Sequence, residues 1–88
     1  MVSQKVTVMN ASGLHARPAY RLVETAQGFQ SDVRFVHEDV VHNAKSIIDV
    51  LSGCVCAGDQ IELIVSGTDE EEAMQMLMKE IADGLGEA

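Results

Sequence analysis

Residues 13–19 decide how this chain folds, and they read Gly13-Leu14-His15-Ala16-Arg17-Pro18-Ala19. Proline lacks a backbone N–H and has a fixed φ, so a helix tolerates it in the first turn. Apolar residues then recur at helical spacing, and Gly28 supplies a stop. This apolar stripe consists of Ala19, Leu22, Val23 and Ala26. The pattern predicts a helix over residues 16–27 with His15 at its N-terminus.

The place of His15 has a chemical meaning. A helix N-terminus offers unpaired N–H groups and the positive end of the helix dipole, so the backbone of Ala16 and Arg17 is a candidate phosphate receptor. The Arg17 side chain adds a planar fork of donors that suits phosphate oxygens. A histidine alone at such a point is more often a simple helix cap. Because Gly13, Arg17 and Pro18 accompany it, we interpret His15 as an acceptor of a phosphoryl group.

Two other segments carry signals for the start of a helix. Ser46 is typical of an N-cap, with Asp49 three residues later in a near capping-box arrangement, and Gly53 ends this short helix. Thr68 and Glu71 predict a second capping box, before a helix with acidic residues in its first turn. Glycines at 84 and 86 end that last helix. Its predicted apolar stripe consists of Met74, Leu77, Met78, Ile81 and Leu85.

Alternating apolar and polar residues predict four strands. They cover residues 5–9, with Val6 and Val8 facing the core, and residues 32–37, 40–42 and 60–66, with a hairpin turn at residues 38–39. The element order is β-α-β-β-α-β-α. Strands of this kind have one apolar face, and three helices can cover it. The sequence therefore predicts an α+β fold, an open-faced two-layer sandwich in which three helices cover a four-stranded antiparallel sheet.

Length, composition and charge exclude several classes of protein. The 88 residues predict a single domain with an aliphatic core, because only three side chains are aromatic. The net charge of −8 arises within residues 50–88, which hold nine acidic side chains against Lys79, and no basic stripe favours nucleic-acid binding. No apolar run is long enough for membrane insertion, and no apolar region typical of a signal peptide occurs near the N-terminus. We expect a soluble cytoplasmic monomer.

The two cysteines, Cys54 and Cys56, give no sign of a metal site or cofactor. Two ligands do not make a structural zinc site, and the three histidines have no metal-ligand spacing with them. A disulfide between residues two apart would be strained. We expect reduced thiols that behave as small apolar side chains beside the second helix. A redox role for the pair has no support from neighbouring residues in the sequence.

Residues 13–19 and the segment Asn43-Ala44-Lys45-Ser46-Ile47-Ile48 resemble a known family. The first resembles the phosphohistidine motif, and the second the regulatory serine and its flank, of HPr, the histidine-containing phosphocarrier of the bacterial phosphoenolpyruvate-dependent phosphotransferase system (PTS). The resemblance extends over essentially the whole chain, to Gly84-Leu85-Gly86-Glu87. Members of this family adopt the open-faced sandwich that the pattern of elements predicts.

The resemblance implies a relay rather than an enzyme. Enzyme I, phosphorylated by phosphoenolpyruvate, would pass its phosphoryl group to Nδ1 of His15, steadied by Arg17, and the A domains of sugar permeases would receive it next. Ser46 would be the regulatory phosphosite of HPr kinase/phosphorylase, and a transcription regulator is a further expected partner. Partners would dock on an apolar patch near His15. The residues expected in this patch are Tyr20, Ile47, Ile48 and Leu51.

Some residues depart from the family pattern. Tyr20, Glu24 and Gln27 occupy helix positions that are basic or small in many HPr proteins, although Tyr20 can equally be an ordinary half-exposed side chain. The run Gln27-Gly28-Phe29 and the acidic last helix resemble the nitrogen-related paralogue of HPr, whereas Lys45-Ser46-Ile47 favours the sugar-linked or kinase-regulated type. Three hypotheses therefore stay open: a carrier of the sugar system, a carrier of a nitrogen-related or regulatory phosphorelay, and a non-phosphorylated binding module on this fold.

Overall fold

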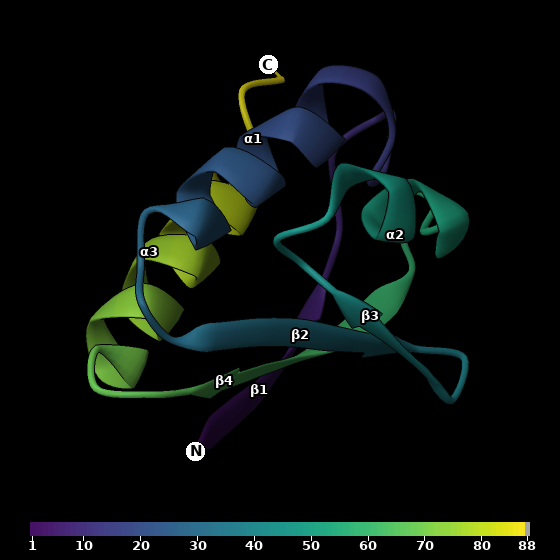
Figure 1. Ribbon diagram of the computed structural model, residues 1–88. Coiled ribbons are helices and arrows are strands. Elements are labelled where there is room, and N and C mark those ends of the chain that lie inside the picture. The colour runs from purple at the N-terminus through teal and green to yellow at the C-terminus, as the bar shows by residue number, and fades with distance from the viewer. Residues whose placement is uncertain (88) are drawn as a thin grey trace.

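The computed structural model describes residues 1–87, and its elements follow the predicted order (Figure 1). The strands are β1 (Val2–Thr7), β2 (Asp32–His37), β3 (Val40–Asn43) and β4 (Gln60–Ser66). The helices are α1 (Ala16–Gln27), α2 (Ile47–Ser52) and α3 (Glu70–Ala82). The bounds of α1, β2 and β4 are those expected from the sequence, because each has an unbroken apolar period between clear stops.

The four strands form one antiparallel sheet in the order β1-β4-β2-β3. Val33 pairs with Val65 and Phe35 with Leu63, and all four side chains are buried. Because side chains alternate across a strand, these residues form one apolar face. The helices lie over that face, and the opposite face is open (Figure 1). The predicted α+β open-faced sandwich is confirmed.

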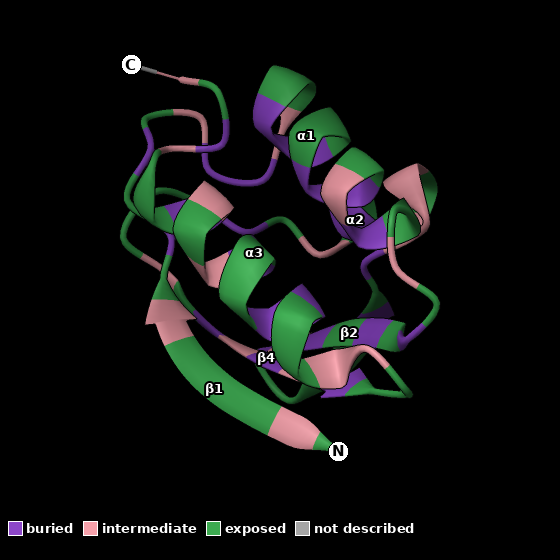
Figure 2. Ribbon diagram, turned by 90° about the vertical axis from the view of Figure 1, so that its left-hand side faces the viewer, coloured by how far each residue is buried: buried purple, intermediate pink, exposed green. Residues whose placement is uncertain are grey.

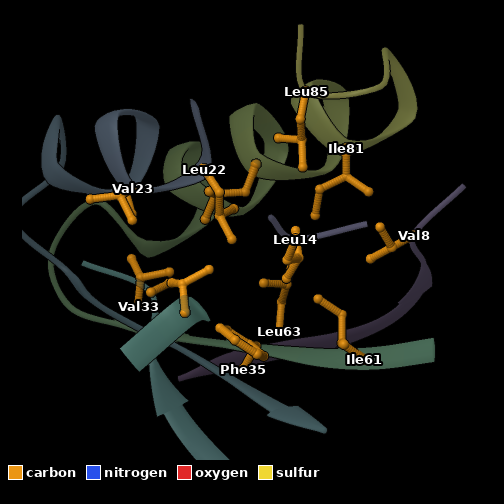
Figure 3. Packing of buried hydrophobic residues seen from close by; sticks show 14 of the residues in the cluster. Val8, Leu14, Leu22, Val23, Val33, Phe35, Ile61, Leu63, Ile81 and Leu85 are labelled. Atoms are coloured by element: carbon orange, nitrogen blue, oxygen red, sulfur yellow. The ribbon is translucent and has the colours of Figure 1, made fainter. Parts of the chain in front are cut away.

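The core lies between the helices and the sheet (Figure 3). As expected from the composition, it is almost wholly aliphatic, and among residues 1–87 Phe35 is the single buried phenyl ring. That ring stacks on His42, with a centroid separation of 5.0 Å. Leu22 of α1, Leu77 of α3 and Leu63 of β4 are fully buried. None of the helices within residues 1–87 is long and apolar enough to cross a membrane.

The first strand differs from its predicted position. It covers Val2–Thr7 rather than residues 5–9, and Val6 is only partly buried. Val8 is fully buried as predicted, but it lies beyond the strand, where its backbone still bonds to Asp59 and Gly58. β1 starts three residues earlier than predicted because β4 supplies hydrogen-bonding partners for every residue from Val2 to Thr7. Polar residues at an edge strand hide that pairing from a pattern based on burial.

The predicted capping box of Thr68 and Glu71 is wrong. The N-cap of α3 is Asp69, which makes no side-chain bond to its own helix. Its carboxylate instead accepts from the backbone N–H groups of Gln30 and Ser31, each at 2.9 Å, and from the Ser31 hydroxyl. A tertiary contact between the α1–β2 connection and α3 has therefore replaced the local cap.

The apolar stripe of α3 ends one turn earlier than predicted. Leu85 is fully buried, but it follows the helix in a left-handed conformation with φ 53°. Gly84 has φ 84°. Its N–H donates to the carbonyl of Ile81, and the N–H of Leu85 donates to the carbonyl of Glu80. These two bonds make a Schellman motif, which needs a residue at positive φ. Gly84 thus ends the helix and turns Leu85 back into the core.

Candidate functional site

His15 lies at the N-cap position of α1, as predicted. Its backbone is extended, with φ −132° and ψ 162°, and its side chain makes no capping hydrogen bond. The residue is half-buried, whereas Arg17 is exposed and Pro18 is buried. The imidazole is therefore accessible at the N-terminus of α1. It does not satisfy the backbone donors that a typical N-cap side chain would take.

Ala16 opens the helix in a left-handed conformation, with φ 52°. For a residue with a Cβ this conformation costs about 1–2 kcal/mol. Adjacent residues of left- and right-handed conformation aim successive N–H groups into a concavity that binds anions. The pair Ala16 and Arg17 has this arrangement, since Arg17 is already helical. The backbone geometry thus supports the predicted phosphate receptor, with the guanidinium of Arg17 on the same short segment.

The loop before His15 is held against the segment that precedes β4. The N–H of Leu14 donates to the carbonyl of Val55 at 2.9 Å. Gly13 has φ 61°, and a Cβ added there would overlap the Val55 carbonyl oxygen and crowd the Cα of Cys56. Glycine is therefore required at position 13 both for its backbone conformation and for this close approach.

Glu87 ties the same loop to the C-terminal segment, a contact that the sequence did not reveal. Its carboxylate accepts from the Ser12 N–H at 3.0 Å, from the Ser12 hydroxyl, and from Asn10 Nδ2 at 3.1 Å. These bonds lower the pKa of Glu87, and the bond from the Ser12 hydroxyl is the largest cause. The positive charge of Arg17 lowers the pKa further and is the smallest cause. No local sequence pattern could have predicted this Glu87 clamp, because Ser12 and Asn10 lie 75 and 77 residues before Glu87 in the chain.

Ser46 is the N-cap of α2, and its hydroxyl accepts from the N–H of Asp49 at 3.3 Å. The reciprocal half of the expected capping box is absent at this helix. The Asp49 carboxylate instead accepts from the N–H of Asn43 and lies against Nδ1 of His42, each at 2.8 Å. The Asn43 bond is the largest cause of the lowered pKa of Asp49. Asp49 therefore ties α2 to β3, and the Ser46 hydroxyl remains at the helix N-terminus.

The residues predicted to contact partners lie on α1 and α2, which pack against each other (Figure 2). Tyr20 on α1 is 60% exposed, and on α2 Ile48 is 78% and Leu51 39% exposed. Ile47 is partly buried against the core. Gln27 at the end of α1 donates from Nε2 to the carbonyl of Lys45, in the segment before α2, at 3.1 Å. Exposed apolar side chains thus occur on both helices, whose N-termini carry His15 and Ser46.

The other two histidines occupy quite different environments. Both are 7% exposed, and each lies against a carboxylate, His37 against Asp59 at 3.1 Å and His42 against Asp49 at 2.8 Å. Their rings are therefore committed to the fold, and His15 is the histidine that a partner can reach. In the part of the chain that the structure describes, no three potential metal ligands come together.

Comparison with known proteins supports one family throughout. A family model for the PTS HPr component phosphorylation site matches residues 2–83. The phosphocarrier protein HPr of Treponema pallidum is 39% identical over 77 residues, which cover 88% of this chain and 88% of that protein. The HPr-like protein Crh of Bacillus subtilis is 44% identical over 77 residues, covering 88% and 91%.

The solved structures lead to the same family. The structure of HPr-C-His from Thermoanaerobacter tengcongensis superimposes with a TM-score of 0.97 at 38% identity, covering 100% of this chain and 99% of that chain. Fold, sequence similarity and the family model therefore agree. The chain belongs to the HPr family of phosphocarrier proteins of the phosphotransferase system.

Proposed function

We propose that the chain accepts a phosphoryl group on His15 from phosphorylated enzyme I and passes it to the A domains of sugar permeases. HPr phosphocarriers are not catalysts themselves, so the chain would act as acceptor and then as donor. The observation that carries the proposal is the open N-terminus of α1. There, an accessible imidazole that caps nothing precedes a left-handed Ala16, and Arg17 follows within the first helical turn.

The chemistry needs little more than this arrangement. Phosphoryl transfer depends mainly on positioning and on neutralising charge, and less on covalent work by the protein. A neutral ring nitrogen of His15 attacks phosphorus, and the bond from phosphorus to the donor histidine of enzyme I breaks. The N–H groups of Ala16 and Arg17 and the Arg17 fork would then hold the phosphoryl oxygens. The loop of residues 10–14, held by bonds to Val55 and Glu87, fixes the backbone directly before His15.

The direct test is phosphoryl acceptance. We expect incubation with phosphoenolpyruvate and a sugar-system enzyme I to add one phosphoryl group, measured as intact mass, and brief acid treatment to remove it. Peptide mapping at alkaline pH should place the group on His15 and not on His37 or His42. A parallel incubation with a nitrogen-type enzyme I separates the two branches. Acceptance from neither enzyme would reject the proposal and favour a binding module.

A second proposal concerns Ser46 as a regulatory phosphosite for HPr kinase/phosphorylase. Its support is the position of the hydroxyl at the N-terminus of α2, two residues before the exposed Ile48. A phosphate there is compatible with the helix dipole. It adds roughly two negative charges to the docking face, by which we mean the partner-binding side chains proposed on α1 and α2 (Tyr20, Ile47, Ile48 and Leu51). Glu24, also exposed on that face, would add to the repulsion of an acidic partner. Such a carrier would transfer more slowly and could instead engage a transcription regulator.

The Ser46 proposal is tested with purified HPr kinase and ATP. We expect one added phosphoryl group that survives acid, in contrast to phosphohistidine, and a slower transfer from enzyme I to His15. Ser46→Ala should gain no acid-stable group. A kinase that modifies a known HPr but leaves this chain unmodified would remove the regulatory assignment without affecting the one for His15.

A further inference from the structure

Two exposed thiols stand directly after the docking helix α2. Gly53 is the C-cap of α2, and Cys54 follows it in a left-handed conformation with φ 51°. Cys54 and Cys56 are both free and exposed, so they are not buried apolar side chains as a small core filler would be. The Cys56 thiol donates toward the carbonyl of Cys54, with a sulfur–oxygen distance of 3.5 Å. Both exposed thiols thus belong to one short segment, residues 53–56.

The backbone that carries these thiols is braced from both sides. Nδ1 of the buried His37 donates to the carbonyl of Gly53 at 2.9 Å. Asp59 accepts from the N–H of Cys56 at 2.9 Å, and Nε2 of His37 lies 3.1 Å from the same carboxylate oxygen. Segment 53–56 is therefore fixed between α2 and β4. A group attached to either sulfur cannot be accommodated by swinging this segment away from the rest of the molecule.

Segment 53–56 connects two parts of the carrier that a partner would contact, namely helix α2 and the loop that precedes His15. The N–H of Cys54 bonds to the carbonyl of Leu51 at 3.3 Å, at the end of the docking helix. The carbonyl of Val55, between the two cysteines, accepts from Leu14, which precedes His15. We propose that Cys54 and Cys56 form a thiol-modification site, at which a mixed disulfide with a low-molecular-weight disulfide hinders docking and slows phosphoryl transfer. This inference rests on the proposed phosphocarrier function.

The modification is a single thiol–disulfide exchange. A cysteine thiolate attacks one sulfur of the small disulfide, a new S–S bond forms to the protein, the old S–S bond breaks, and the second half leaves as a thiolate. No other oxidant is needed, and a reducing thiol reverses the step. We assign the inhibitory position to Cys54, because it adjoins Leu51, whereas the Cys56 thiol is turned back toward the backbone.

The experiment measures adduct formation and transfer separately. The native protein is incubated with glutathione disulfide, its intact mass is recorded, and excess disulfide is removed before phosphorylation by enzyme I is timed. We expect at least one glutathionyl adduct and a transfer rate lowered by roughly tenfold, the loss typical of disturbing one important interface contact. Dithiothreitol should restore both mass and rate. The methylthio group from methyl methanethiosulfonate is a matched small adduct, and it should leave the rate within about twofold if bulk at the interface is the cause.

Two variants assign the effect. Cys56→Ser should retain the inhibition by glutathione disulfide, whereas Cys54→Ser should lose it although Cys56 can still be modified. Absence of an adduct on the native protein, or an adduct that leaves the transfer rate unchanged, would overturn the inference. Equal inhibition of both variants would overturn the assignment to Cys54. Failure of the unmodified protein to accept a phosphoryl group would refute the phosphocarrier function instead, and the mass measurement distinguishes the two failures.

Discussion

The N-termini of α1 and α2 are built in opposite ways. At α1, His15 makes no capping bond and the first turn contains no acidic residue. At α2, Ser46 caps the helix and Asp49 lies in the first turn. The positive end of α2 is thus partly satisfied by the chain itself, whereas that of α1 has neither a side-chain cap nor an acidic residue beside it. Under the proposed function, the helix end that receives a transferable phosphoryl group has no side-chain cap, whereas the proposed regulatory site at Ser46 keeps one.

The stability that α1 lacks at its N-terminus comes from its flank. Pro18, Leu22 and Ala26 are buried on the side facing the sheet. Arg21 forms a two-pronged ion pair with Glu80 of α3, at 3.0 and 3.1 Å. An N-cap is worth about 1 kcal/mol, which packing of one further side chain can exceed. The helix can therefore keep an open end, and the variants below test whether function and stability separate in this way.

The largest effect is expected from His15→Ala. Phosphoryl acceptance from enzyme I, measured by intact mass, should be abolished because the acceptor nitrogen is gone. The free energy of unfolding in urea should change by less than about 0.5 kcal/mol, because the side chain caps nothing and is half-exposed. A variant that still accepts the group, or that unfolds much more easily, would break the contrast between the two helix ends.

Arg17→Lys should be the next most severe change. Lysine keeps the charge but cannot offer two parallel donors to a phosphoryl group, so we expect a transfer rate lowered by roughly tenfold with unchanged stability. Arg21→Lys is the matched control, since Arg21 binds Glu80 on α3. The control should transfer at the wild-type rate. Equal rates for wild type and Arg17→Lys in rapid-quench measurements would remove the role of the fork.

Glu87→Gln tests the clamp on the loop that positions His15. The amide has one uncharged acceptor oxygen where the carboxylate has two charged ones, so the bonds from Ser12 and Asn10 weaken. We expect transfer to slow by a few-fold, about the effect of one hydrogen bond. The pKa of Glu87 is lowered in the fold, so its contribution to stability is present above its ordinary pKa and is lost as pH falls through the lowered value.

Acid titration of the Glu87 clamp supplies the measurement. Wild type should lose stability faster than Glu87→Gln as pH falls below the ordinary glutamate range, when urea unfolding is followed at several pH values. Glu72→Gln, which changes an exposed acid of α3, should keep the wild-type pH dependence. Parallel curves for wild type and Glu87→Gln would show that the clamp is not formed in solution.

These positions also show what the sequence could and could not predict. The bounds of α1 follow from Pro18, an apolar stripe and a stop at Gly28, all within one window of residues. The contacts of Glu87 and Asp69 join segments far apart in the chain, and such carboxylates can satisfy distant donors as readily as a local cap. For that reason the capping box at Thr68 is wrong, and the one at Ser46 is half-formed.

Ser46→Ala should affect stability and leave acceptance on His15 intact, the reverse of His15→Ala. Loss of the bond to the N–H of Asp49 should lower the free energy of unfolding by about 1 kcal/mol. Ser46→Asp is the matched variant, because aspartate is an equally good N-cap, and it should regain the stability while slowing transfer by its charge. If alanine costs nothing in urea unfolding, the cap is not a stabilising contact.

The smallest effect is expected at Ala16, and it bears on why the open helix end exists. Glycine removes a left-handed penalty of about 1–2 kcal/mol but adds unfolded-chain entropy worth about 0.4–1 kcal/mol, so the two nearly cancel. Ala16→Gly should therefore unfold in urea within about 1 kcal/mol of wild type. Ala26→Gly, in the right-handed and buried part of α1, should lose at least about 1 kcal/mol. Equal losses would mean that Ala16 is right-handed in solution, and the anion-binding concavity would then form only when the phosphoryl group arrives.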